Sequence, residues 1–160
     1  QIPIAYIVKN TGRPIDPNNK YTSKYLDIPN VALFPFGWGL SYTTFTYSPL
    51  KLSAFEIKPG QKLSVNVTVT NTGAFDGEET VQLYIRDMVG SVTRPIKQLR
   101  GYQKIFLKKG ESRDVMLELT LEDLKFYDKN MRWLAEPGQF KVMVGGNSVE
   151  LQEAFFTLIK

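Results

Sequence analysis

Carboxylic acids are the side chains of this sequence that could take part in acid–base or nucleophilic chemistry. A carboxyl group does such work when burial or a neighbouring charge shifts its pKa and a cleft brings a second group beside it. The candidates are Glu78, Glu79, Asp114, Glu118, Glu122 and Asp123. They fall on the expected polar faces of strands, in turns or at a helix start. We therefore expect solvated surface charges and no catalytic residue.

The composition removes most other chemistries. The 160 residues include no histidine and no cysteine, which excludes a Ser-His-Asp triad, a cysteine nucleophile, a thiolate metal site and a disulfide. Lys and Arg number 20 against 16 Asp and Glu, and these charges are interspersed. Nucleic-acid binding would need a concentrated basic stripe, and no apolar run approaches the length of a membrane-spanning helix. We expect no cofactor, no metal, no nucleic-acid partner and no membrane span.

Aromatic residues are the candidate contacts for a ligand or for another domain. Trp38 and Tyr42 belong to the string Phe34–Phe45, in which glycines on both sides of a tryptophan allow close backbone approach. We expect this string to be a packed crossing between domains, with a sugar platform on Trp38 or Tyr42 as the alternative. Tyr127 and Trp133 flank an expected hairpin turn. We expect them to pack into the core or against a partner domain, and stacking on a sugar ring is the alternative.

From about Ser48 onward, apolar and polar residues alternate with a period of two. This pattern is typical of strands with one buried side and one solvent-facing side. The expected inward positions are Leu63, Val65, Val67 and Val69, then Val81, Leu83 and Ile85, then Val115, Leu117 and Leu119, and finally Phe140, Val142 and Val144. Further strands are expected at Leu50–Ile57, Gln98–Leu107 and Ala154–Ile159.

About seven short strands separated by turn residues predict an all-β fold, an antiparallel β-sandwich of immunoglobulin or fibronectin type III kind. One helical turn is expected at Thr120–Leu124, with Asp123 as the capping-box partner. The preceding residues form an irregular N-terminal extension, in which the apolar run Ile2–Val8 predicts a buried strand. A lone strand leaves its backbone groups unpaired. We therefore expect Ile2–Val8 to add to a sandwich edge, to pair with a second copy or to belong to a larger assembly.

Several short strings, in the same order, resemble the C-terminal portion of family 3 glycoside hydrolases, the β-glucosidases and β-xylosidases. The most specific string is Phe34–Phe45, which resembles the segment between the α/β-sandwich domain and the fibronectin type III-like domain of that family. The other matching strings are Gln1–Ile4, Asn10–Pro14 and Tyr21–Asp27 upstream, and Val69–Gly73, Asp76–Glu79, Val81–Asp87, Arg94–Tyr102 and Glu136–Gly146 downstream. The resemblance covers nearly the whole chain.

The resemblance implies two parts, the end of an α/β-sandwich domain with its linker at residues 1–47 and a fibronectin type III-like domain at residues 48–160. The family's nucleophile and acid/base carboxylates lie in earlier domains, and neither motif occurs here, so this chain alone is expected to be inactive. The implied role is that of a non-catalytic C-terminal structural domain. The implied parent is a retaining, exo-acting β-glycosidase, most closely a β-glucosidase, that hydrolyses terminal β-linked sugars.

The implied partners are the catalytic domains of the parent enzyme and its β-linked oligosaccharide substrate, and self-association through Ile2–Val8 is a further expectation. The resemblance favours a periplasmic or secreted protein, and a cytoplasmic one stays open. Two rival functions are a stand-alone carbohydrate-binding module with an exposed aromatic strip and an adhesion-type sandwich that binds protein. The Phe34–Phe45 string argues against both rivals, because a stand-alone module does not need a crossing segment.

Overall fold

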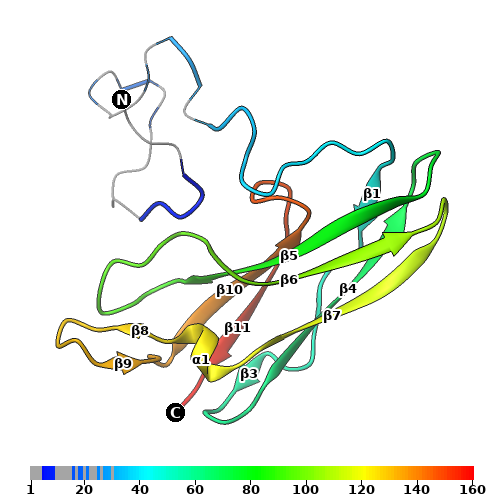
Figure 1. The fold of residues 1–160 in the computed structure, drawn as a ribbon. Helices are drawn as coiled ribbons and strands as arrows, with labels where there is room; N and C mark the ends of the chain where they lie inside the picture. The colour runs from blue at the N-terminus through cyan, green and yellow to red at the C-terminus, as the bar shows by residue number, and fades with distance from the viewer. Residues whose placement is uncertain are drawn as a thin grey trace.

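Two facing β-sheets make up the body of the protein (Figure 1). The structure is a computed structural model that describes residues 5–9, 16, 18–19, 21, 25, 27–29 and 31–160. The strands in these residues are β1 (Phe45–Tyr47), β2 (Lys51–Leu52), β3 (Glu56–Ile57), β4 (Leu63–Asn71), β5 (Gly77–Asp87), β6 (Gln98–Leu107), β7 (Ser112–Leu119), β8 (Phe126–Tyr127), β9 (Trp133–Leu134), β10 (Gly138–Gly145) and β11 (Gln152–Leu158). The helix α1 (Leu121–Leu124) connects β7 to β8.

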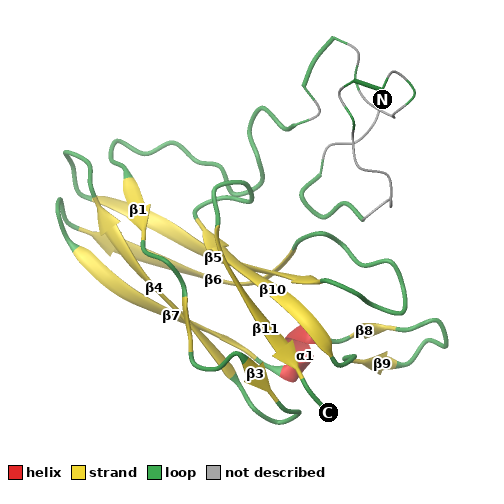
Figure 2. Ribbon diagram, turned by 180° about the vertical axis from the view of Figure 1, so that it is seen from behind, coloured by secondary structure: helices red, strands yellow, loops and turns green. Residues whose placement is uncertain are grey.

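The strand order confirms the predicted sandwich. In the four-stranded sheet β4 is central, with β1 and β2 along one edge and β7 along the other. The five-stranded sheet has the order β3-β11-β10-β5-β6, in which β3 lies parallel to β11 and the other neighbours are antiparallel. The strands β8 and β9 form a separate hairpin beside α1 (Figure 2). The described residues therefore form an all-β sandwich of fibronectin type III-like kind.

The core lies between the two sheets, where the expected inward residues meet. Burial alternates along all nine residues of β4, and its partners across the core include Leu83, Phe140 and Phe156, which are buried. The rings of Phe140 and Phe156 stack with their centroids 5.5 Å apart. Leu117 is the exception among the expected inward residues, because it is only half-buried at the edge of this core.

The outer face of the five-stranded sheet differs from the prediction. Gln82 and Tyr84 on β5 and Met143 on β10 were expected to face water, and all three are buried. The expectation of one solvent-facing side is therefore wrong in the middle of this sheet. Tyr6 contacts Tyr84, and the backbone of Gly37 packs on Gln82, so residues from before β1 cover this face.

Two local expectations about strands also change. The single strand predicted at Leu50–Ile57 is divided, because β2 pairs in the four-stranded sheet and β3 pairs in the five-stranded sheet. Residues 5–8 of the strand predicted at Ile2–Val8 are not a strand, and residues 2–4 lie outside the described residues. One isolated bridge joins Lys9 to Pro95, and the Ile96 amide donates to the Val8 carbonyl over 2.9 Å. The described part of this run therefore contacts the β5–β6 loop through a single bridge.

The predicted helical turn is present. The backbone N–H of Thr120 donates to the Asp123 carboxylate over 2.7 Å, as in a capping box. The Asp123 carboxylate thereby pairs the Thr120 amide, which has no partner within the four-residue helix.

Candidate functional site

The aromatic string Phe34–Phe45, called the crossing segment below, is fixed to the sandwich by its backbone. Gly37 has φ of +82°, and a Cβ atom there would lie 2.4 Å from the side-chain amide of Gln82, so a glycine is required. The Ser148 amide donates to the Phe36 carbonyl over 2.8 Å, which ties the segment to the β10–β11 turn. The crossing segment is therefore held in one place before it enters β1.

Aromatic side chains continue this contact over the outer face of β5. The Tyr6 ring stacks on Phe36 at 4.4 Å and meets Tyr84 edge-on at 5.8 Å. The Tyr84 hydroxyl donates to the Gln82 side-chain oxygen, and burial raises the pKa of Tyr84 to about 12. The Gln82 side-chain nitrogen donates in turn to the Gly146 carbonyl. These polar groups are buried and hydrogen-bonded, which is how such a covered face stays stable.

Asn71, the last residue of β4, is a buried hydrogen-bonding centre at the same end. Its Oδ1 accepts from the Thr43 hydroxyl over 2.5 Å and from the Gly73 amide over 3.1 Å. Its Nδ2 donates to the carbonyls of Phe75 over 2.8 Å and Leu107 over 3.1 Å. All four hydrogen-bonding capacities of the amide are used. Asn71 therefore links the crossing segment to both sheets, whereas the sequence indicated it only as part of the resembling string Val69–Gly73.

An apolar surface faces solvent on and just before the crossing segment. Its members are more than half exposed: Ile28, Val31, Leu33, Phe34, Leu40 and Tyr42. Leu40 is 94% and Tyr42 is 93% exposed. The string was expected to pack, and within it Phe36 packs on Tyr6, whereas Phe34 and Leu40 are largely exposed. Several large apolar side chains exposed along one stretch of chain are candidates for contact with another protein surface.

Trp38 lies at a pocket of about 630 Å³ beneath the crossing segment. The charged residues that line it are Glu78, Glu79 and Glu150, and none of its described lining residues is basic. The Tyr47 hydroxyl donates to Glu79 Oε1 over 2.5 Å. Burial raises the pKa of Glu79, while the Tyr47 hydrogen bond opposes that rise; burial and this carboxylate also raise the pKa of Tyr47. Glu79 is thus an acidic group that the fold partly desolvates.

The Glu79 carboxyl group should make stability depend on pH. Its folded pKa lies above the unfolded value, so its favourable contribution is complete below the unfolded pKa and is lost as pH rises through the folded pKa. We compare the free energy of unfolding of Glu79→Gln with that of the unsubstituted chain. The value for the variant minus the value for the unsubstituted chain should increase as pH rises from about 4 to about 8. Urea denaturation at several pH values measures this difference.

Tyr47→Phe is the matched control for that measurement. It removes the hydroxyl that stabilises the Glu79 carboxylate and so raises the pKa of Glu79 further. The free energy of unfolding should therefore fall more strongly with rising pH in this variant. A Glu79→Gln advantage that shrinks with rising pH would contradict the assigned direction of the pKa shift.

The other two predicted contact residues, Tyr127 and Trp133, lie on the β8–β9 hairpin. They face each other across it, with ring centroids 4.9 Å apart and an interplanar angle of 49°. Tyr127 is 57% exposed and Trp133 is 47% exposed. The expectation that they pack into the core is therefore wrong. The inward side of the hairpin is taken by Phe126 and Leu134 instead.

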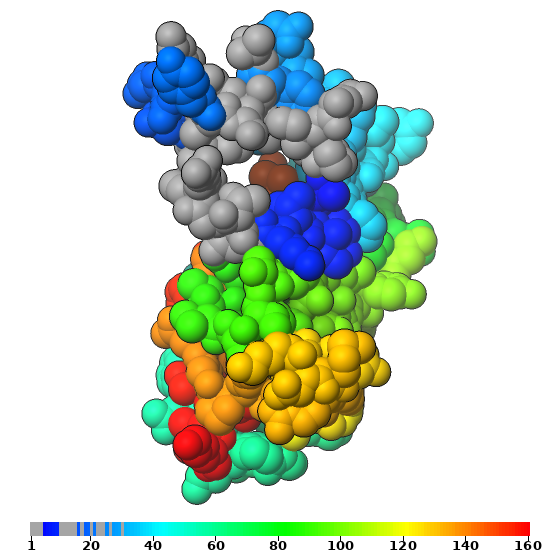
Figure 3. Space-filling model, turned by 90° about the vertical axis from the view of Figure 1, so that its left-hand side faces the viewer, coloured from blue at the N-terminus to red at the C-terminus, as the bar shows by residue number. Residues whose placement is uncertain are grey.

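The β5–β6 loop, residues 88–97, is anchored by Arg94. Its guanidinium lies 4.1 Å from the ring centroid of Phe126, and its Nη2 donates to the Gln98 side chain over 2.9 Å. Its Nε lies 3.9 Å from the Asp87 carboxylate; burial raises the pKa of Asp87, and the arginine charge opposes that rise. Residues 5–9, this loop and the β8–β9 hairpin follow one another down one side of the molecule (Figure 3). Sequence patterns placed Arg94 only within a resembling string.

Of the six candidate carboxylates, only Glu78 and Glu79 lie together at the pocket beneath the crossing segment, and the expectation of a solvated surface charge is wrong for the half-buried Glu79. Glu78 pairs with Lys104, Glu118 with Lys62, and Glu122 with Lys125. Asp114 accepts a hydrogen bond from Thr68, and Asp123 caps α1. Among the described residues, no group of three or more acidic side chains could hold a metal ion. A search of the same residues finds no helix with the length and apolar character needed to cross a membrane.

Comparisons with solved structures extend over nearly the whole chain. The β-glucosidase from Listeria innocua in complex with gluconolactone superposes with a TM-score of 0.92 and 36% identity, over 99% of this chain and 22% of that one. A β-glucosidase from Erythrobacter marinus superposes with a TM-score of 0.85 and 41% identity, over 96% of this chain and 19% of that one. The likeness therefore includes residues before the sandwich.

Curated relatives show the same extent of similarity. The periplasmic β-glucosidase of Salmonella typhimurium is 45% identical over 99% of this chain and 21% of its own length. A putative β-xylosidase of Formosa agariphila is 41% identical over 100% of this chain and 20% of its own length. This chain spans about a fifth of the length of these relatives.

Residues 79–148 match the fibronectin type III-like domain family. Together with the sheet order, this match identifies the fold as a fibronectin type III-like sandwich preceded by an N-terminal extension. Over nearly its whole length, the chain matches the C-terminal fifth of the β-glucosidases and β-xylosidases of glycoside hydrolase family 3.

Proposed function

We propose that this chain is the non-catalytic C-terminal structural part of a larger retaining, exo-acting β-glycosidase, most closely a β-glucosidase. The parent enzyme hydrolyses terminal β-linked sugars of oligosaccharides. In this proposal the end of an α/β-sandwich domain and its linker precede the sandwich that braces the catalytic domains. The boundary expected at residue 48 moves to Phe45, because β1 pairs with β4 in the sandwich. The parent is periplasmic or secreted, as the name of the Salmonella relative suggests.

The observation that carries the proposal is the apolar surface on and before the crossing segment. Leu40 and Tyr42 are almost fully exposed, although the segment that bears them is held rigidly by Gly37 and Asn71. A rigid backbone that presents large apolar side chains to water is suited to contact with another domain. The similarity to about a fifth of each relative supports the same interpretation, because the remaining length would supply the covering domains.

A charge placed on the apolar surface should act differently in the chain and in the parent enzyme. In the chain alone, Leu40→Asp should change the free energy of unfolding by no more than about 0.5 kcal/mol, because the side chain is exposed. In the full-length enzyme the same change buries a carboxylate against the catalytic domains and should cost about 2 kcal/mol or more. Thermal unfolding of both proteins measures the two effects.

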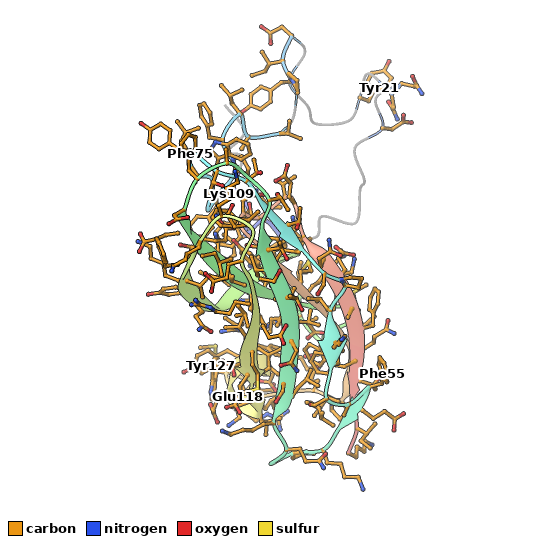
Figure 4. All side chains as sticks on the ribbon, turned by 90° about the vertical axis from the view of Figure 1, so that its right-hand side faces the viewer. Tyr21, Phe55, Phe75, Lys109, Glu118 and Tyr127 are labelled. Carbon is orange, nitrogen blue, oxygen red and sulfur yellow. The ribbon has the colours of Figure 1, made fainter. Side chains whose placement is uncertain are left out.

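Phe55→Asp is the matched control. Phe55 is a similarly exposed apolar residue, and it lies well away from residues 31–42, beside β3 (Figure 4). We expect it to leave the full-length enzyme unchanged within the same small range. Equal losses for both variants in the full-length enzyme would argue against the assigned surface.

The chain alone should not hydrolyse aryl β-glucosides or β-xylosides. Retaining hydrolysis needs two carboxyl groups flanking one glycosidic bond. Of the expected candidates, Glu78 and Glu118 pair with lysines and Asp123 caps α1, whereas Glu79 is hydrogen-bonded to Tyr47. A chromogenic glycoside assay on the purified chain tests this. Turnover that persists after removal of contaminating enzyme and is lost in Glu79→Gln would overturn the non-catalytic assignment.

A further inference from the structure

The outward side of the β8–β9 hairpin carries two aromatic rings that the sandwich does not use for its core. Tyr127 and Trp133 are directly opposed in the hairpin register, so both side chains project from the same face. Roughly half of each side chain remains exposed. An exposed tryptophan beside an exposed tyrosine leaves apolar ring surface in water, which makes the pair a candidate contact surface.

The hairpin holds this pair in a fixed position. Asp128 is buried and closes the turn: its Oδ1 accepts from the amides of Asn130 and Arg132, and its Oδ2 accepts from the Arg132 guanidinium. On the inward side, Phe126 is buried beneath the Arg94 guanidinium. A surface that is ordered before a ligand arrives loses less conformational entropy on binding.

Polar groups lie at the rim of the rings. The Trp133 indole N–H donates to Glu122 over 3.2 Å, and the same carboxylate pairs with Lys125. The Tyr127 hydroxyl adds a donor and acceptor at the tip of its ring. An aromatic face bordered by a carboxylate, an ammonium and a hydroxyl matches a pyranose sugar, which has an apolar face of C–H groups and a rim of hydroxyls.

We propose that the Tyr127–Trp133 pair is a sugar-stacking surface that binds one pyranose ring of a β-linked gluco-oligosaccharide. The rings are tilted by 49°, so they cannot both lie flat against consecutive sugars of an extended chain. One pyranose stacks on Trp133, with Tyr127 at its edge and Glu122 accepting from its hydroxyls. Binding is weak, in the millimolar range, because a single stacked ring buries little surface.

The hairpin lies away from the apolar surface of the crossing segment. In Figures 1 and 2 residues 31–42 run above the sandwich, whereas the hairpin lies near its lower end. Tyr127 and Tyr21 are likewise far apart in Figure 4. Contact at that apolar surface alone would therefore leave the hairpin uncovered. The choice of a β-linked glucan rests on the proposed function, whereas the stacking itself does not.

The two tryptophans of the chain allow a direct test by fluorescence. Trp38→Phe leaves Trp133 as the sole tryptophan, and Trp133→Phe leaves Trp38. Cellobiose and cellotetraose are titrated into each variant, with sorbitol as a ringless polyol and maltotetraose as an α-linked control. Circular dichroism and urea denaturation confirm that each variant is folded.

We expect a saturable change in the Trp38→Phe variant and none in the Trp133→Phe variant. Adding Tyr127→Ala to Trp38→Phe should weaken binding about fivefold or more, and cellobiose and cellotetraose should differ by no more than about threefold, because one ring is bound. No saturation in Trp38→Phe, an equal response to sorbitol, or a response only from Trp38 would overturn the proposal. Equal binding of maltotetraose would overturn the β-linked assignment alone, and neither result depends on the Leu40→Asp experiment.

Discussion

Replacing Asn71 with alanine is expected to lower the free energy of unfolding by about 3 kcal/mol. The side chain is fully buried and makes four hydrogen bonds, to Thr43, Gly73, Phe75 and Leu107. Its removal leaves a buried hydroxyl, an amide and two carbonyls without this partner, and each loss carries a desolvation penalty. Urea denaturation followed by circular dichroism measures the change.

Asn66→Ala is the control for this variant. Asn66 lies in the same strand but on its outer, partly exposed face, so we expect a loss of about 0.5 kcal/mol or less. The Asn71 variant should also release the crossing segment, because the Thr43 contact is lost, and limited proteolysis should cut within residues 37–44. Similar stabilities for the two variants would show that Asn71 does not link the segment to the sheets.

The second large effect is expected for Leu83→Ala. Leu83 is fully buried in the middle of β5, so truncation leaves a cavity and should cost about 3–4 kcal/mol. Leu117 is the same residue type on an expected inward position, but it is half-buried, and its truncation should cost only about 1–1.5 kcal/mol because solvent already reaches it. The ratio between the two losses, measured in one denaturation series, tests whether the core is centred on β5 and β10. Equal losses would place the centre of the core nearer β7.

The strand pattern, the capped helical turn and most of the core were predictable because they depend on neighbours in sequence. Alternation with a period of two assigned Val65, Val67, Leu83 and Val142 to the core, and all four are buried. The same pattern assigned Gln82, between the inward residues Val81 and Leu83, to a solvent-facing side. That assignment is wrong because the crossing segment and Tyr6 cover β5, and a local pattern carries no information about a covering segment from elsewhere in the chain.

The sequence predicted which residues are candidate contacts, but it did not predict how exposed each one is. Their types identified Trp38, Tyr42, Tyr127 and Trp133, but their exposure depends on which side of a strand meets the core. In the two-residue strand β8, Phe126 turns inward and Tyr127 turns outward, and the sequence of such a short strand cannot distinguish these two phases. Asn71 and Arg94 were missed as organising residues because their partners lie tens of residues away in sequence.

The parallel pairing of β3 with β11 has a consequence for how the chain acquires its fold. Within the sandwich, β3 leaves the ribosome before most of the other described strands, whereas its partner β11 follows all of them. Until β11 emerges, β10 also lacks one of its two neighbours. Contacts between distant parts of a sequence slow folding, so we expect the five-stranded sheet to assemble only after synthesis of β11 is complete. Ribosome-bound chains that end before β11 should therefore remain sensitive to protease, whereas chains extended by a flexible linker should become resistant.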